Sequence, residues 1–139
     1  MALSPDYEFP ELSQIEGVPS PSLVISPEKI RANIKLMIKI AVGPERLRPH
    51  VKTHKMAEVV ALQQEQGVRK FKCATLAEMQ MLLTCRAKDI LLAMQPVGPI
   101  TESLVQLSKE YPDTHFSTLV DNSETVSYTH LTLPTIYSV

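Results

Sequence analysis

Hydrophobic positions along this 139-residue chain alternate between helical spacing and short unbroken apolar runs. A first helix is expected from Pro27, because Ser26 can act as its N-cap and proline is favoured at the first helical position. Gly43 and Pro44 are expected to end this helix. Its apolar residues recur every three or four positions, so the helix should bury one face: Ile30, Ile34, Met37, Ile38 and Ala41.

Beyond this helix, strand-like and helix-like segments alternate. Thr75 and Glu78 have the capping-box form at the start of one helix, and the apolar run from Ile90 to Met94 is typical of a strand buried on both faces. The expected elements are a strand over 47–51, a helix over 56–66, a strand over 71–74, a helix opening at 75–78, a strand over 90–94, a helix over 100–111 and a strand over 115–120.

This alternation predicts an α/β fold with a parallel sheet and right-handed crossovers. Four strand–helix units make about half of a (β/α)8 barrel. An open doubly wound sheet is the alternative, but the chain has no GxGxxG or P-loop sequence to support a nucleotide site on it.

Three segments differ in character. Residues 1–21 are rich in proline and acids and are expected to form an N-terminal arm, whereas 22–125 carry the alternating pattern. Residues 126–139 contain no Asp, Glu, Lys or Arg. One interpretation of this tail is a polar, β-type terminal segment. The preferred one is a sequencing-adapter artefact, since residues 126–135 match one frame of a transposase-based adapter. The natural chain is then interrupted near Thr125, and no function belongs to Tyr128, His130 or Tyr137.

Composition excludes several function classes. With 14 basic and 15 acidic residues, the chain has no net charge that would attract nucleic acid or an anionic membrane. No segment resembles a signal peptide, and no apolar run approaches the ~20 residues that cross a bilayer. Cys73 and Cys85 lack the spacing of a metal or redox motif, so both are expected to be free thiols in the cytoplasm.

The segment Arg48-Pro49-His50-Val51-Lys52-Thr53-His54-Lys55 carries the candidate chemistry. In a strand, alternation places Arg48, His50 and Lys52 on one face, which would be the inner face of a barrel. Buried cations need an anionic ligand or acidic neighbours. Lys52 would lie near the carboxyl end of the strand, where barrel enzymes keep their active sites. A lysine amine there can form a Schiff base with an aldehyde if nearby cations, such as His50 and Arg48, lower its pKa.

Three other interpretations of this segment stay open on pattern alone. It can be a solvated basic strand end with no chemistry. His50 and His54 have the i,i+4 spacing of metal ligands on a helix, although Pro49 disfavours a helix and no Glu follows His50 as in HExxH. A nucleic-acid patch is the weakest interpretation, because no aromatic residues are interleaved with the charges.

The segment 48–55 resembles the RPHxKTHK signature of the D-threonine aldolase and D-serine dehydratase family, which has an alanine-racemase-like barrel. The likeness extends in order over about residues 17–124. The further matching segments are GVPSPSLV at 17–24, CATLAE at 73–78, DILL at 89–92, QPVGP at 95–99 and VDN at 120–122.

This resemblance implies a lyase that depends on pyridoxal 5'-phosphate and acts on D-β-hydroxy amino acids, by retro-aldol cleavage of D-threonine or dehydration of D-serine. Lys52 is then the Schiff-base lysine, with His50 as a cofactor-binding neighbour and Gln95 as a further active-site candidate. Thr75 and Glu78 are assigned to helix capping. A non-catalytic pyridoxal-phosphate carrier and an amino-acid racemase of the same fold are the alternatives.

The resemblance also implies features outside this chain. The family holds a divalent metal, zinc or manganese, in a C-terminal β domain that is absent here, and its phosphate-binding residues lie in later barrel strands. The parent protein is expected to be a cytoplasmic homodimer that acts on a small D-amino acid. Expressed alone, the half-barrel should be poorly soluble and inactive, because it leaves a sheet edge and apolar helix faces exposed.

Overall fold

The computed structural model describes residue 13 and residues 15–121, so the tail at 126–139 lies outside the described residues and the expectation for it stays a prediction. The described part contains helices, strands and two 3₁₀ turns. They are α1 (Pro27–Ala41), η2 (Pro44–Arg46), η3 (Val51–Thr53), α2 (Ala57–Glu65), β1 (Lys70–Cys73), α3 (Leu76–Thr84), β2 (Asp89–Leu92), α4 (Pro99–Glu110) and β3 (His115–Thr118). None of these helices is long and apolar enough to span a bilayer.

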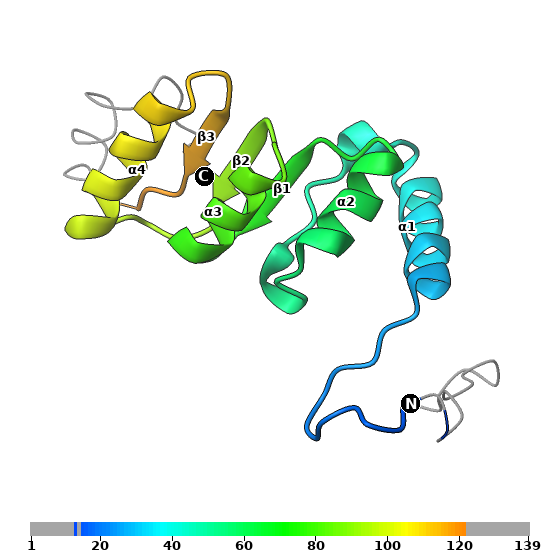
Figure 1. The fold of residues 1–139 in the computed structure, drawn as a ribbon. Coiled ribbons are helices and arrows are strands. Elements are labelled where there is room, and N and C mark those ends of the chain that lie inside the picture. The colour runs from blue at the N-terminus through cyan, green and yellow to red at the C-terminus, as the bar shows by residue number, and fades with distance from the viewer. Residues whose placement is uncertain (1–12, 14, 122–139) are drawn as a thin grey trace.

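The three strands form one parallel sheet in the order β1-β2-β3. Phe71 pairs with Ile90, and Ile90 pairs with Phe116, so consecutive strands lie side by side without a register break. Each strand is joined to the next by a helix, and α3 and α4 pack beside each other along the sheet (Figure 1). The expected α/β fold with a parallel sheet is confirmed.

The core lies between the sheet and its helices. Alternation along each strand turns Phe71, Cys73, Ile90 and Leu92 toward α3 and α4, where all four are fully buried. The opposite face is less covered, and Leu91 on it is only partly buried. The sequence predicts burial of this strand on both faces, and the structure shows complete burial on the face toward α3 and α4 and partial burial at Leu91 on the other.

The expected strand over 47–51 is also not formed as predicted. It is reduced to a single parallel bridge between His50 and Lys72, with 3₁₀ turns before and after it. Pro49 explains the loss, because proline has no N–H to donate to a sheet ladder. Its carbonyl still accepts from the Lys72 amide at 2.9 Å, so the segment is attached to the edge of β1 by very few backbone bonds.

The first helix forms where its capping residues predict. The Ser26 hydroxyl accepts from the Lys29 amide at 3.3 Å, and Pro27 occupies the first turn of α1. The helix ends at Ala41, and the capping residue after it, Val42, adopts a left-handed conformation with φ +63°. Glycine is the residue that usually takes this position, so valine is strained there.

Candidate active site around Lys52

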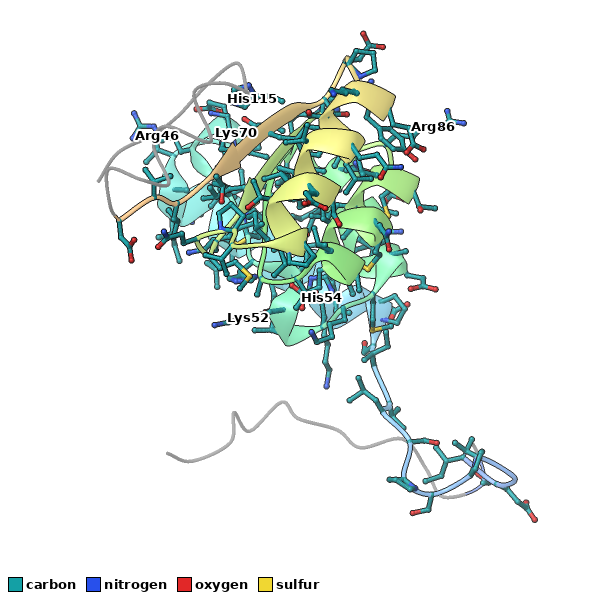
Figure 2. All side chains as sticks on the ribbon, turned by 90° about the vertical axis from the view of Figure 1, so that its left-hand side faces the viewer. Arg46, Lys52, His54, Lys70, Arg86 and His115 are labelled. Carbon is teal, nitrogen blue, oxygen red and sulfur yellow. The ribbon has the colours of Figure 1, made fainter. Side chains whose placement is uncertain are left out.

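Lys52 lies in the turn η3, immediately after the bridge that joins His50 to β1. In Figure 2 it is at the end of the molecule opposite Lys70 and His115, which begin β1 and β3. Lys52 is therefore at the carboxyl ends of the parallel strands, as the sequence predicts, although a turn and not a strand presents it. Its side chain is exposed and its amine is accessible.

The turn that carries Lys52 is closed by its own backbone and by one histidine. The amides of His54 and Lys55 both donate to the carbonyl of Val51, at 3.2 and 2.8 Å. The Lys52 amide donates to Nδ1 of His50 at 3.2 Å, so His50 caps the turn. Val51 is fully buried in the core and anchors the turn from below.

His50 must be neutral to accept this hydrogen bond, since a protonated imidazole has no free nitrogen lone pair. Burial lowers the pKa of His50, and the charges of Lys52, Lys72 and Lys55 lower it further, whereas Glu78 opposes them. The neutral, accepting form is thereby favoured near pH 7. The structure thus places His50 directly beside Lys52, where it supports the backbone of the lysine.

Glu78 is the acidic residue of this cluster. It lies in the first turn of α3, is 4% exposed, and its carboxylate accepts from the Ala74 amide at 2.7 Å. The other carboxylate oxygen accepts from the Lys55 ammonium group. Burial alone would raise the pKa of Glu78, but the hydrogen bonds from Lys55 and Ala74 and the positive charge of Lys55, with that of His50 once it is protonated at acidic pH, bring the pKa below its usual value. Glu78 is therefore ionised at neutral pH.

Sequence reasoning assigned Glu78 to capping alone and did not single out Lys55. Thr75 does cap α3, since its hydroxyl accepts from the Glu78 amide at 3.2 Å. The carboxylate, however, does not return to the amide of Thr75 as in a regular capping box. Its bond to Lys55 joins positions 23 residues apart, a contact that no local pattern in the sequence could indicate.

Arg48 does not join this cluster, contrary to the interpretation that it helps to tune Lys52. Its guanidinium group makes a bidentate pair with Asp89, at 2.6 and 2.9 Å. Asp89 pairs in register with Lys70 and His115, which lie at the end of the sheet away from Lys52. Arg48 thus has the acidic neighbour that a buried cation needs, and that neighbour is Asp89. The pair lies at the end of the segment away from Lys52.

His54 lies close to Lys52 in the sequence and in Figure 2, but it does not form a metal site with His50. Nδ1 of His54 accepts from the Met56 amide at 3.1 Å, as Nδ1 of His50 does from Lys52. Within residues 15–121, no group of three His, Cys, Asp or Glu residues could hold a metal ion. Both histidines therefore serve the backbone of this segment, and the i,i+4 metal interpretation has no support here.

Gln95 follows β2 by three residues and is partly buried in the connection to α4. It is thus at the same end of the sheet as Lys52, which agrees with its selection as a candidate neighbour. Its role as an active-site neighbour stays a prediction.

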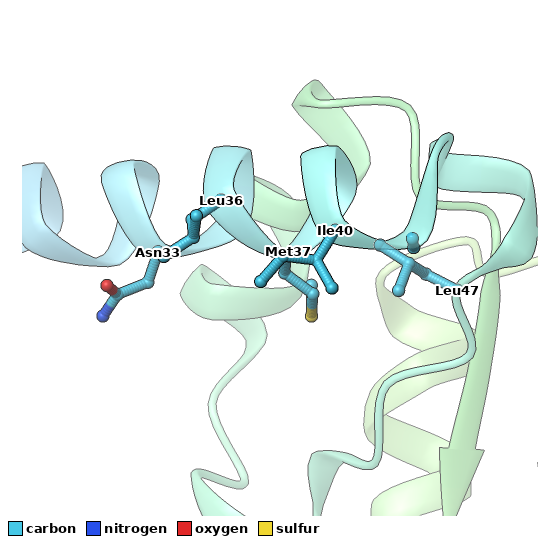
Figure 3. A pocket seen from close by; sticks show the side chains of 6 residues that line it. Asn33, Leu36, Met37, Ile40 and Leu47 are labelled. Atoms are coloured by element: carbon cyan, nitrogen blue, oxygen red, sulfur yellow. The ribbon is translucent and has the colours of Figure 1, made fainter.

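A separate apolar hollow of about 390 Å³ runs along α1 (Figure 3). It is lined by Asn33, Leu36, Met37, Ile40, Ala41 and Leu47. None of these residues carries a titratable group, and the hollow includes no residue of the cluster around Lys52. It is therefore not a candidate for the chemistry of this site.

Comparison with known proteins gives one family match. Residues 25–130 match the family described as the alanine racemase N-terminal domain. This range includes η3 and all three described strands.

A D-threonine aldolase of an Arthrobacter species is 31% identical over 112 residues, which are 79% of this chain and 29% of that protein. The crystal structure of a D-threonine aldolase from Filomicrobium marinum has a TM-score of 0.71 at 22% identity, over 88% of this chain and 34% of that chain. A D-threo-3-hydroxyaspartate dehydratase, solved as its H351A mutant, has a TM-score of 0.68 at 27% identity, over 81% of this chain and 28% of that one. The chain thus spans about a third of the length of these relatives.

Proposed function

Because this chain belongs to the alanine racemase N-terminal domain family, we propose that it is part of a pyridoxal-phosphate-dependent lyase in which Lys52 holds the cofactor. The observation that carries the proposal is the placement of Lys52. It is an exposed primary amine on an anchored turn at the carboxyl ends of parallel strands, where active sites of this architecture lie.

The residues around Lys52 fit such a cofactor. An aldehyde needs an accessible amine, and a phosphorylated, anionic molecule is attracted by cations. Three of the four charged groups that act on His50 are lysines, Lys52, Lys55 and Lys72, so the local potential is positive. When bound, pyridoxal phosphate supplies an electron sink for a carbanion at the α-carbon of an amino acid. This chain contributes Lys52 as the covalent anchor, and His50 supports the backbone of Lys52.

The substrate class proposed is D-β-hydroxy amino acids. Relatives of this chain include a D-threonine aldolase and a D-threo-3-hydroxyaspartate dehydratase, whose names describe cleavage and dehydration of such compounds. Retro-aldol cleavage of D-threonine and dehydration of D-serine both begin at the α- and β-carbons that this cofactor activates. The divalent metal and the homodimer are part of the same proposal, with metal ligands outside the described residues.

Site-resolved trapping tests the role of Lys52. The 139-residue chain, kept in solution by a fusion partner, is mixed with pyridoxal phosphate, reduced with borohydride and digested for mass spectrometry. We expect the pyridoxyl group mainly on Lys52, and its loss in Lys52→Arg. Lys35→Arg on the exposed side of α1 is the control and should leave the labelling unchanged. Equal labelling of all exposed lysines would refute the proposal.

A further inference from the structure

The turn that carries Lys52 contains a strained residue and has few backbone bonds to the sheet. Lys55, which ends the turn, adopts a left-handed backbone with φ +51°, a conformation that costs a non-glycine residue energy. The segment before the turn is joined to β1 by only one bridge. The buried Val51 and the His50 cap hold the start of this turn, but a further contact is needed to hold its strained end at Lys55.

The Glu78 carboxylate supplies such a hold. One oxygen is fixed by the Ala74 amide, at the end of β1, and the other accepts from the ammonium group of Lys55. Glu78 is 4% exposed whereas the side chain of Lys55 is 61% exposed, so the acid is the fixed partner and the lysine reaches to it. Lys55 is thereby tied to the rigid junction of β1 and α3.

Helix capping does not account for this arrangement. Thr75 already caps α3, and the Glu78 carboxylate is directed to the residue before the cap and to a different segment. A buried carboxylate is costly unless its partners repay the desolvation. Here the partners are one amide at the end of β1 and one ammonium group at the end of the Lys52 turn.

We propose that Glu78 is a positioning residue for Lys52, acting through Lys55 to fix the turn Val51–Lys55 at the end of β1. This proposal rests on the proposed function of Lys52. Its second effect is electrostatic, since Glu78 is the acid that opposes the three lysines around His50. The same residue thus holds the turn and partly offsets the lowering of the His50 pKa by the lysines.

The test compares Glu78→Gln with Glu102→Gln, a matched change in the first turn of α4, where the glutamate is exposed. Pyridoxal-phosphate trapping at Lys52 is measured relative to trapping at Lys35 in the same sample. We expect this ratio to fall about tenfold in Glu78→Gln, the change that corresponds to loss of one charge-assisted hydrogen bond, and to stay unchanged in Glu102→Gln.

Variants at Lys55 keep the proposal testable if Glu78→Gln fails to fold. Lys55→Asn removes the ammonium group but tolerates the left-handed backbone, so it should lower the ratio to the same extent. Lys55→Arg retains a cation for Glu78 and should keep most of the trapping. A ratio unchanged in both Glu78→Gln and Lys55→Asn would overturn the proposal.

A second readout does not depend on the cofactor. The titration of His50, followed by NMR, should move to lower pH in Glu78→Gln, because a negative charge that favours the protonated imidazole is removed. If Glu78 had a merely structural role, the pKa of His50 would not change in a folded Glu78→Gln variant. An unchanged pKa of His50 therefore counts against the proposal. If the wild-type chain shows no preference for Lys52 in the trapping experiment, the proposed function fails first, and the two failures are distinguishable.

Discussion

Replacing Asp89 by asparagine tests how the segment that carries Lys52 is attached to the sheet. Arg48 reaches across β1 to Asp89 on β2, while the backbone of its own segment has a single bridge to β1. The two side chains of this pair are 26% and 22% exposed, so solvent screens the charges only in part. The pair should therefore contribute more than a surface ion pair does.

The magnitude follows from the geometry. Charged hydrogen bonds contribute roughly 1.5 to 3 kcal/mol, and a bidentate guanidinium–carboxylate pair is at the strong end of such interactions. Asp89→Asn leaves the guanidinium group of Arg48 half-buried without its anion, so we expect a loss of about 2 kcal/mol in the free energy of unfolding. For a domain of this size that corresponds to a fall of roughly 10 °C in Tm.

Urea and thermal denaturation followed by far-UV circular dichroism measure this loss, with Glu65→Gln as the matched control. Glu65 also pairs with an arginine, Arg31, but those side chains are 43% and 52% exposed, and the change should cost less than about 0.5 kcal/mol. The double variant with Arg48→Met should lose less than the sum of the single losses. Equal effects of Asp89→Asn and Glu65→Gln, or strictly additive losses at Arg48 and Asp89, would refute this reasoning.

Two further predictions concern pH and one strained residue. Burial lowers the pKa of His50 and of His54 below the usual value of 6.5, so the unfolded chain binds protons more readily than the folded chain does. The free energy of unfolding should be fully retained above pH 6.5 and should fall as the pH drops toward 5; urea midpoints from pH 5 to 8 measure this, and a flat profile contradicts it. Val42→Gly should stabilise the chain by about 0.5 to 1 kcal/mol, because Val42 is left-handed and 75% exposed. A lower Tm for this variant would show that the valine is not strained.

Local patterns in the sequence predicted the helices and the order of the elements. The caps at Ser26 and Thr75 and the apolar spacing gave α1 and α3 close to their observed bounds, because such signals act within one turn of helix. The predicted strand over 47–51 does not form, because Pro49 removes a ladder donor. The proline is visible in the sequence, but the sequence does not show how far it reduces the pairing with β1. The position of Lys52 near the strand ends was predictable from the signature and the fold.

Long-range side-chain pairs were not predictable in the same way. The sequence predicts that Arg48 needs an acidic partner. It does not indicate that this partner is Asp89, 41 residues later, or that the pair lies away from Lys52. Glu78 satisfied a local capping pattern, and that adequate explanation concealed its contact with Lys55. Both pairs depend on how strands align in the sheet, which a local pattern does not contain.

The two thiols of this chain allow the opening of β1 to be followed by chemical modification. Burial raises the pKa of Cys73, inside β1, to about 12, whereas Cys85 at the end of α3 is partly exposed and its pKa is raised less. Alkylating reagents attack the thiolate, so Cys85 should be modified first and Cys73 only when the strand separates from its neighbours. The delay between the two modifications therefore measures how long β1, to which the Lys52 turn is attached, stays paired with its neighbours. No label has to be introduced into the chain.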